Sequence, residues 1–400
     1  MNLAGNPLKR TQKLDTGRVR RFILPDRKIR VTQITTFCPD IIGPGPTHLY
    51  LIENDALVLL DTGIPTKLAK RFFYDSRNQI IPPEIEALPE DYSKQELLEG
   101  LHLAGHSIKD VDLLVITHGH PDHFLMGRWI VEQANCPVTA HALDTSDICN
   151  PWGMLEMWFN LRQRTMAMGM PQPKGVSDSN HFYMEDVNPE SIGFSLKVDF
   201  PIMQEGLLTL NHSSLKGIEV KHLPGHSPGS VGLIVGQEGS EKVLLCGDVL
   251  LSPITPHPDD LLTYLRTLEK LKNLQDIVLA LPAHGKVIRN VKARVDFLQK
   301  YHRQRLKITY KTCRKPCSAW DIATLPDYFD IAVDPSKFNP LAGNEALMHM
   351  EVLQMVQGLK RVSINKGVHL FQNQGEPFEE VYNRILDLVK DQRINPIMRY

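Results

Sequence analysis

The seven residues from Thr117 to His123, in the order Thr-His-Gly-His-Pro-Asp-His, contain three histidines and an aspartate. Neutral imidazole suits zinc and iron, and a carboxylate adds a hard, charged ligand. The preceding residues 111–116 form a short apolar run typical of a buried strand, and residues 124–134 have helical spacing. The pattern therefore predicts metal ligands on a turn at a strand end. A surface loop that holds histidines by chance is the less favoured interpretation.

Further polar side chains follow other predicted strands. His226 lies in the turn Leu-Pro-Gly-His-Ser-Pro-Gly-Ser, Asp248 follows the apolar run 243–246, and His284 follows residues 277–281. Asp61 ends a buried strand, where a carboxylate is costly unless it is paired. It either caps the next element or orients a metal ligand, and we favour the second role. Ser227 is expected to support a ligand rather than act as a nucleophile.

These turns supply more ligands than one tetrahedral zinc ion can accept. The set fits two metal ions that share a carboxylate and leave room for a bridging water. Its members are His118, His120, Asp122, His123, His226, Asp248 and His284.

The order of these motifs, beginning with Asp61-Thr62-Gly63, resembles the metallo-β-lactamase superfamily over residues 28–300. The resemblance implies an α/β fold, an αββα sandwich with the site at one edge. It implies that His118, His120 and His226 hold a first metal, that Asp122, His123 and His284 hold a second, and that Asp248 bridges them. Asp122 and Asp248 are the expected catalytic carboxylates, and a metal-bridging hydroxide is the expected nucleophile.

Differences from particular branches of the family restrict the range of candidate substrates. Asp248 stands where the commonest zinc β-lactamases have a cysteine, and the first motif lacks the glutamate of flavodiiron proteins. Asp248 and His284 are too close in the sequence for the large inserted cap of one RNA-processing branch. The remaining group includes glyoxalase II, lactonases, thioesterases and some nucleases.

The last hundred residues contain a capped helix start at Ser318, a periodic helix at 344–357, and strands 360–363 and 368–372 around Asn365-Lys366-Gly367. This pattern resembles the small winged-helix domain of the superfamily branch that includes a mitochondrial endoribonuclease. Few basic residues lie on 344–357, so we favour packing on the catalytic domain over DNA binding. The predicted domains are an arm (1–27), a metallo-β-lactamase domain (28–305) with a helical insertion near 148–175, and a C-terminal winged-helix-like α+β domain (306–400).

The insertion is rich in methionine and aromatic residues over 151–171. Methionine-rich surfaces adapt to their ligands, so we predict a lid or pocket wall in which Trp152, Trp158 and Phe159 bind substrate. Plain core or a dimer contact is the alternative. His257, just past the bridging aspartate, is either a substrate contact or an ordinary loop histidine.

Composition restricts the cellular location and the partners that can be expected. The 400 residues are 42% hydrophobic and carry a formal net charge of -1. This charge argues against a strong overall positive potential that would attract nucleic acid. The six scattered cysteines form no disulfide framework, and Cys313 with Cys317 would make only half a metal site. No apolar run reaches the roughly 18 residues of a spanning helix. We predict a cytoplasmic protein with a small-molecule substrate and no membrane partner, nucleic acid being less favoured and a homodimer left open.

The leading hypothesis is a dinuclear zinc hydrolase, with iron or manganese also fitting the ligands. Its predicted substrate is an ester, thioester or lactone with an apolar portion. One alternative is a metal-dependent endoribonuclease or phosphodiesterase, favoured by the C-terminal resemblance. The other is a mononuclear iron enzyme resembling persulfide dioxygenases.

Overall fold

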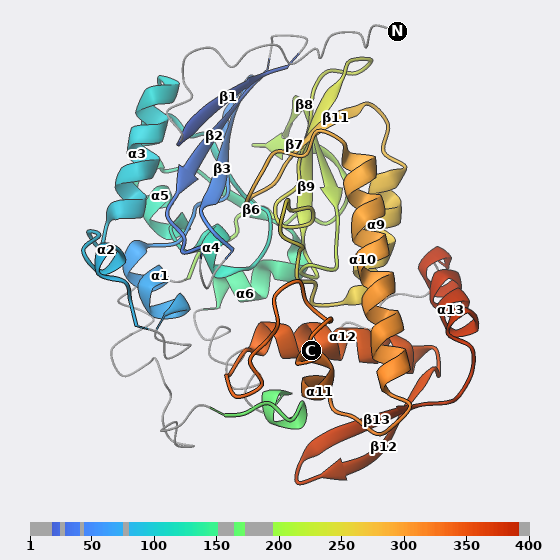
Figure 1. Ribbon diagram of the computed structural model, residues 1–400. Helices are drawn as coiled ribbons and strands as arrows, with labels where there is room; N and C mark the ends of the chain where they lie inside the picture. Colours follow the sequence, from blue (N-terminus) through green and yellow to red (C-terminus); the bar gives the residue numbers. More distant parts are fainter. Residues whose placement is uncertain are drawn as a thin grey trace, which may run out of the picture. The chain divides into compact units, whose positions relative to one another are not determined.

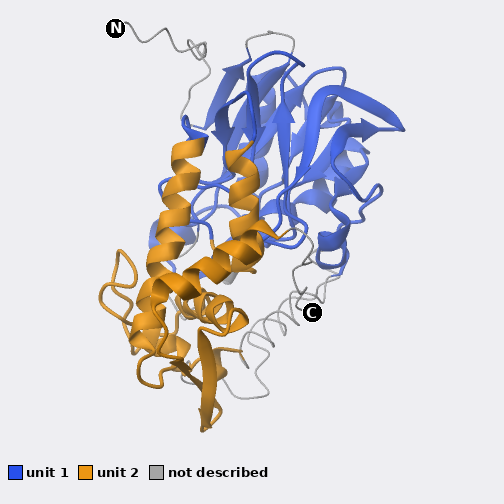
Figure 2. Cartoon of the chain, turned by 90° about the vertical axis from the view of Figure 1, so that its right-hand side faces the viewer, with its two compact units in different colours: residues 1–151, 186–256, 274–291 blue, residues 152–185, 257–273, 292–400 orange. Residues whose placement is uncertain are grey.

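The computed structural model describes residues 18–24, 29–40, 44–74, 80–150, 164–172 and 195–391. The chain divides into two compact units, coloured separately in Figure 2. Unit 1 comprises residues 1–151, 186–256 and 274–291, and unit 2 comprises residues 152–185, 257–273 and 292–400. Among the described residues, no helix is long and apolar enough to cross a membrane.

The first sheet of unit 1 has, within the described residues, six strands in sequence order. The strands are β1 (Val19–Ile23), β2 (Arg30–Thr36), β3 (Thr47–Glu53), β4 (Leu57–Leu60), β5 (Leu113–Ile116) and β6 (Val138–Ala140). Pairing is antiparallel from β1 to β4 and parallel from β4 to β6. Every residue of β4 and β5 is buried, which explains why both strands are continuous apolar runs without alternation.

Helices form the crossovers that the parallel pairs require. Between β4 and β5 lie α1 (Thr66–Phe73), α2 (Pro83–Glu86) and α3 (Tyr92–Ala104), and between β5 and β6 lie α4 (Pro121–Phe124) and α5 (Gly127–Ala134). A short helix, α6 (Thr145–Cys149), follows β6. Figure 1 shows α1, α3 and α5 on the side of the first sheet that faces away from the second.

The second sheet of unit 1 has the order β11-β10-β9-β8-β7 within the described residues. Its strands are β7 (Gly206–Leu210), β8 (Ser213–His222), β9 (Val231–Val235), β10 (Lys242–Leu245) and β11 (Ile277–Leu281). Side chains from both sheets, including Val31, Val58, Leu233 and Val243, meet in one buried apolar cluster. The core of unit 1 therefore lies between two stacked sheets, and the segments after β4, β5, β8, β10 and β11 carry the predicted metal ligands and their supporting residues.

Unit 2 is mainly helical. Its described elements are α9 (Leu261–Lys272), α10 (Val291–Thr312), α11 (Ala319–Ala323), α12 (Pro340–Met355), β12 (Leu359–Asn365), β13 (Val368–Asn373) and α13 (Phe378–Lys390). The first residue of α10, Val291, still belongs to unit 1. Ser318 and Asp321 form the capping box expected at the start of α11. The helix expected from residue 344 begins earlier, with Pro340 in the first turn and Asn339 as the capping residue.

The hairpin predicted around Asn365-Lys366-Gly367 is present as β12 and β13. α9 and most of α10 belong to unit 2 together with these C-terminal elements. The domain boundary at residues 305/306 and the winged-helix identity remain predictions.

The described part of the methionine-rich insertion belongs to unit 2. Met168 and Met170 are buried, and both lie against Gly343 of α12. These two methionines are therefore core residues of unit 2. Trp152, Trp158 and Phe159 lie outside the described residues, so their role as a lid or pocket wall remains a prediction.

Candidate metal centre

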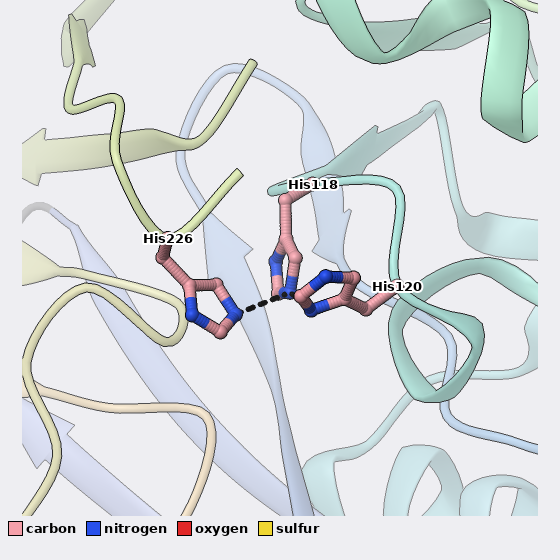
Figure 3. Close-up of side chains that lie close together, drawn as sticks. All are labelled: His118, His120 and His226. Atoms are coloured by element: carbon pink, nitrogen blue, oxygen red, sulfur yellow. Dashed lines mark hydrogen bonds between the residues drawn. The ribbon is translucent and has the colours of Figure 1, made fainter. Parts of the chain in front are cut away.

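Three histidine rings from two loops of unit 1 converge on one point (Figure 3). Nε2 of His118 lies 3.0 Å from Nδ1 of His120 and 3.1 Å from Nε2 of His226. A single hydrogen can link only one pair of these nitrogens, and the lone pairs of neutral imidazoles repel one another. The arrangement therefore suits a cation held between the three rings.

A second group lies beside the first and combines a carboxylate with two more histidines. Asp122 Oδ2 is 3.1 Å from Nε2 of His284, and Asp122 Oδ1 is 3.7 Å from Nε2 of His123. The ligand atoms of all three side chains are close enough to share one ion. All three side chains are buried.

The carboxylate of Asp248 lies between the two groups. Its Oδ2 is 3.6 Å from Nε2 of His226 and 3.6 Å from Nε2 of His123, which belong to different groups. Its Oδ1 is 3.6 Å from Nε2 of His284. The structure thus brings together all seven ligands that the sequence predicted.

Several of these atoms have unused hydrogen-bonding capacity. In the described part of the chain, Asp122 Oδ2, His123 Nε2, Asp248 Oδ1 and His284 Nε2 are buried and make no well-aligned hydrogen bond, although Asp122 Oδ2 and His284 Nε2 lie 3.1 Å apart. Each such atom costs on the order of 1–3 kcal/mol. A bound cation would supply the missing partner for all four, and nitrogen and carboxylate donors are those that zinc accepts. The residues therefore fit a metal ion.

The protonation states of His118 and of the two carboxylates also favour metal binding. Burial and the neighbouring rings of His123 and His120 hold the pKa of His118 well below its usual value, which leaves its imidazole neutral. Burial opposes ionisation of Asp122, but His123 and His284 outweigh it and lower the pKa of this carboxyl to about 2. The pKa of Asp248 is lowered for the same reason. Both carboxylates are therefore charged at neutral pH.

Comparison with known proteins places this site in a family. The family model of the metallo-beta-lactamase superfamily matches residues 42–284, more than half of the chain. The chain belongs to the metallo-beta-lactamase superfamily. This membership confirms the predicted class, a metal-dependent hydrolase.

Individual relatives of the superfamily are distant. The chain is 23% identical over 338 residues to the probable metallo-hydrolase YqjP of Bacillus subtilis (strain 168), covering 80% of this chain and 92% of that protein. A metallo-beta-lactamase family protein from Thermus thermophilus shares 19% identity with a TM-score of 0.61, over 86% of this chain and 98% of that one. A beta-lactamase domain protein from Burkholderia ambifaria shares 20% identity with a TM-score of 0.61, over 86% of this chain and 92% of that one. These structures confirm the predicted fold.

Within the superfamily site, Asp61 lies where the sequence suggested, beside the ligands. Its Oδ2 is 2.9 Å from Nδ1 of His123, and it accepts hydrogen bonds from both the backbone N–H and the hydroxyl of Thr117. The Thr117 hydroxyl is also 3.0 Å from Nδ1 of His118. These contacts direct the Nε2 atoms of both histidines toward the metal position.

The loop that carries His284 is held by residues of β3 and of the turn before it, which the sequence did not single out as site residues. His48 lies with Nε2 2.9 Å from the carbonyl of Gly285, and the Tyr50 hydroxyl donates to the carbonyl of Pro282. Nδ1 of His284 is 3.1 Å from the carbonyls of Gly45 and Pro46. Donation from Nδ1 to these carbonyls leaves Nε2 available as a ligand.

The other residues singled out in the sequence lie as follows. Ser227 is buried, and its hydroxyl donates to Asp144, a residue that the sequence analysis did not identify. His257 belongs to unit 2, with Nε2 3.2 Å from the carbonyl of Leu341, so its contact with substrate remains a prediction. The sulfur atoms of Cys313 and Cys317 are 3.1 Å apart, and among the described residues neither cysteine belongs to a cluster that could hold a metal ion.

Proposed function

We propose that the chain is a dinuclear zinc hydrolase. In this proposal His118, His120 and His226 hold one ion, Asp122, His123 and His284 hold the other, and Asp248 contacts both. The observation that carries it is the position of Asp248, whose Oδ2 is equally distant from a histidine of each group. When bound, the two ions would activate a shared water as a nucleophile at neutral pH and polarise the substrate's acyl group.

The protein residues prepare the site for this chemistry. Asp122 and Asp248 supply charge, because their pKa values are lowered and both are buried. Asp61 and Thr117 fix the ring orientation of two ligands. Most ligands are shielded from solvent, whereas His120 and Gly119 are partly exposed, and we place substrate entry on their side.

The proposed substrate is an ester, thioester or lactone with an apolar portion. The hydrolase class of the superfamily supports the reaction, and the methionine- and aromatic-rich segment 151–171 supports the apolar portion. The name of the Bacillus subtilis relative, a probable metallo-hydrolase, is consistent with hydrolysis and names no substrate.

Metal analysis and a substrate panel test the proposal together. The purified protein should contain near two zinc ions per chain and should hydrolyse acyl esters, thioesters or lactones. A chelator-treated sample should be inactive and should recover when zinc is added, which controls for a contaminating esterase. Cleavage of single-stranded RNA without acyl hydrolysis would instead support the endoribonuclease alternative. One iron per chain with oxygen-dependent turnover would support the persulfide dioxygenase alternative.

A further inference from the structure

Asp144 connects the two loops that carry the three-histidine group. It lies after β6, at the start of α6, and its side chain is almost fully buried. Its Oδ2 accepts a hydrogen bond of 2.9 Å from the backbone N–H of Gly119, the residue between His118 and His120. A contact from this side chain therefore reaches the middle of the first ligand loop.

The same carboxylate also holds the second loop, at two points on either side of Pro228. Its Oδ2 accepts a hydrogen bond of 2.6 Å from the hydroxyl of Ser227, which directly follows His226. Its Oδ1 accepts a hydrogen bond of 2.5 Å from the backbone N–H of Gly229. One carboxylate thus fixes the spacing between the loops of His118, His120 and His226.

The fit around Asp144 is too close for another side chain at position 229. A Cβ on Gly229 would lie 2.6 Å from Cγ and Oδ1 of Asp144 and 2.8 Å from its backbone nitrogen. In the described residues Asp144 makes no ion pair with a lysine or arginine, so its charge is balanced by hydrogen-bond donors of the two loops. Groups of this kind around metal ligands commonly set affinity for the ion.

We infer that Asp144 is a positioning residue of the three-histidine pocket and sets the affinity of that pocket for its metal. Asp61 contacts His123 of the neighbouring group directly and reaches His118 only through the Thr117 hydroxyl. This inference rests on the proposed two-metal site. It predicts that loss of the Asp144 carboxylate lowers the affinity for one metal equivalent and leaves the affinity for the other unchanged.

The test is a titration of metal-free protein with Co²⁺, followed by visible absorption and by competition with a chromophoric chelator. Asp144→Asn keeps the shape of the side chain but replaces one acceptor oxygen with an NH2 group. That group cannot accept from the loop donors, which are the N–H groups of Gly119 and Gly229 and the Ser227 hydroxyl. Gly229→Ala displaces the carboxylate without changing it. Asp147→Asn, an exposed acidic residue on α6, is the matched control. Each variant is also made with His284→Ala, which removes a ligand of the second group and so isolates the three-histidine pocket.

Asp144→Asn and Gly229→Ala should lower the affinity for one Co²⁺ equivalent by about 10–100-fold and alter its absorption bands. The second equivalent and the Asp147→Asn control should match wild type. Equal weakening of both equivalents, or a lower melting temperature of the metal-free protein with unchanged affinity, would overturn the inference. If wild type binds a single equivalent, the two-metal proposal fails. The His284→Ala background still shows whether Asp144 controls the three-histidine pocket.

Discussion

Oδ2 of Asp61 lies 2.9 Å from Nδ1 of His123, and both side chains are buried. The backbone of Asp61 has φ of 63°, a left-handed conformation that aspartate and asparagine adopt more readily than most residues. Asp61→Asn should therefore keep the fold, but its amide cannot accept from Thr117 and His123 at the same atoms. We expect metal affinity to fall by about 10–100-fold, measured by chelator competition.

Asp61→Ala provides the contrast for this prediction. Alanine also lacks the acceptor, and it disfavours the left-handed backbone, so it should lower both metal affinity and the melting temperature of the metal-free protein. If Asp61→Asn binds metal as tightly as wild type, the carboxylate does not orient His123.

Asp248→Ala should lower the metal content from about two ions per chain toward one and abolish turnover. The reason is that this carboxylate lies between histidines of both groups, 3.6 Å from His226 and from His123. Metal content is measured by elemental analysis after gel filtration, alongside the rate on the best acyl substrate. Two retained ions with near-normal activity would show that Asp248 does not bridge.

The convergence of the seven predicted ligands could be expected from the sequence because each of them lies on a segment that directly follows a strand. His118, Asp248 and His284 each stand just after a buried strand, so local spacing alone indicates that they leave the sheet edges on turns. The fold could be predicted because the order of these motifs resembles that of the superfamily, whose family model matches residues 42–284.

Asp61 could be expected to orient a ligand because it ends a buried strand, but Asp144 and His48, which hold the ligand loops, were not predictable in this way. Asp144 contacts Gly229, and His48 contacts Gly285, across long separations in the sequence. No local period or spacing relates such pairs, because tertiary packing alone brings them together. Asp144 follows a strand as the ligands do, and this weak signal could have marked it as a candidate. The grouping of α9 with the C-terminal helices likewise depends on contacts that periodicity does not encode.

The substrate prediction depends on Trp158 and Phe159, in the segment outside the described residues. Replacing both by alanine should raise KM for a long apolar ester by about tenfold or more, because each buried large side chain contributes about 1.5–3 kcal/mol. Turnover of a small ester and the metal content should barely change. Equal loss on both substrates, or unfolding of the variant, would show that the segment is core.

The close contact between α3 and β2 predicts a stability effect in unit 1. A Cβ added at Gly100 would overlap Cγ2 of Ile34, a fully buried side chain. Gly100→Ala should therefore destabilise the protein by about 1–3 kcal/mol through overpacking, against a gain in helix propensity of about 1 kcal/mol. Urea unfolding measures the net change. Two double variants should separate the effects. Ile34→Val keeps Cγ1 and Cγ2 against the added Cβ, whereas Ile34→Ala removes both and leaves only its own Cβ, 3.2 Å away.

Two buried histidines of unit 2, His302 on α10 and His349 on α12, predict a loss of stability in acid. Nδ1 of His302 lies 3.2 Å from Nε2 of His349, and Nδ1 of His349 lies 2.6 Å from the carbonyl of Glu345. The two ring nitrogens that face each other share a single hydrogen, so the pair cannot hold a proton on both of them, and Nε2 of His302 has no partner among the described residues. A proton added to the pair would therefore place a charge on fully buried rings.

The pKa shifts set the direction and range of this effect. Burial lowers the pKa of His349 to about 4, with Arg305 and His257 acting in the same direction and Glu345 opposing them. Burial and His349 hold the pKa of His302 well below its usual value. An unfolded histidine binds a proton near pH 6.5, so between about pH 6.5 and 4 the unfolded state binds more protons than the folded state. Stability should be complete above pH 6.5 and should fall as the pH drops toward 4.

The difference between wild type and a variant isolates this contribution from the metal site. We expect wild type to lose up to about 3 kcal/mol more than His349→Gln between pH 7 and pH 4.5, because glutamine cannot be protonated. His102→Gln, an exposed position on α3, is the matched control and should follow wild type. Urea unfolding of chelator-treated protein at each pH measures the difference. Parallel pH curves for wild type and His349→Gln would show that the buried pair does not cause the acid sensitivity.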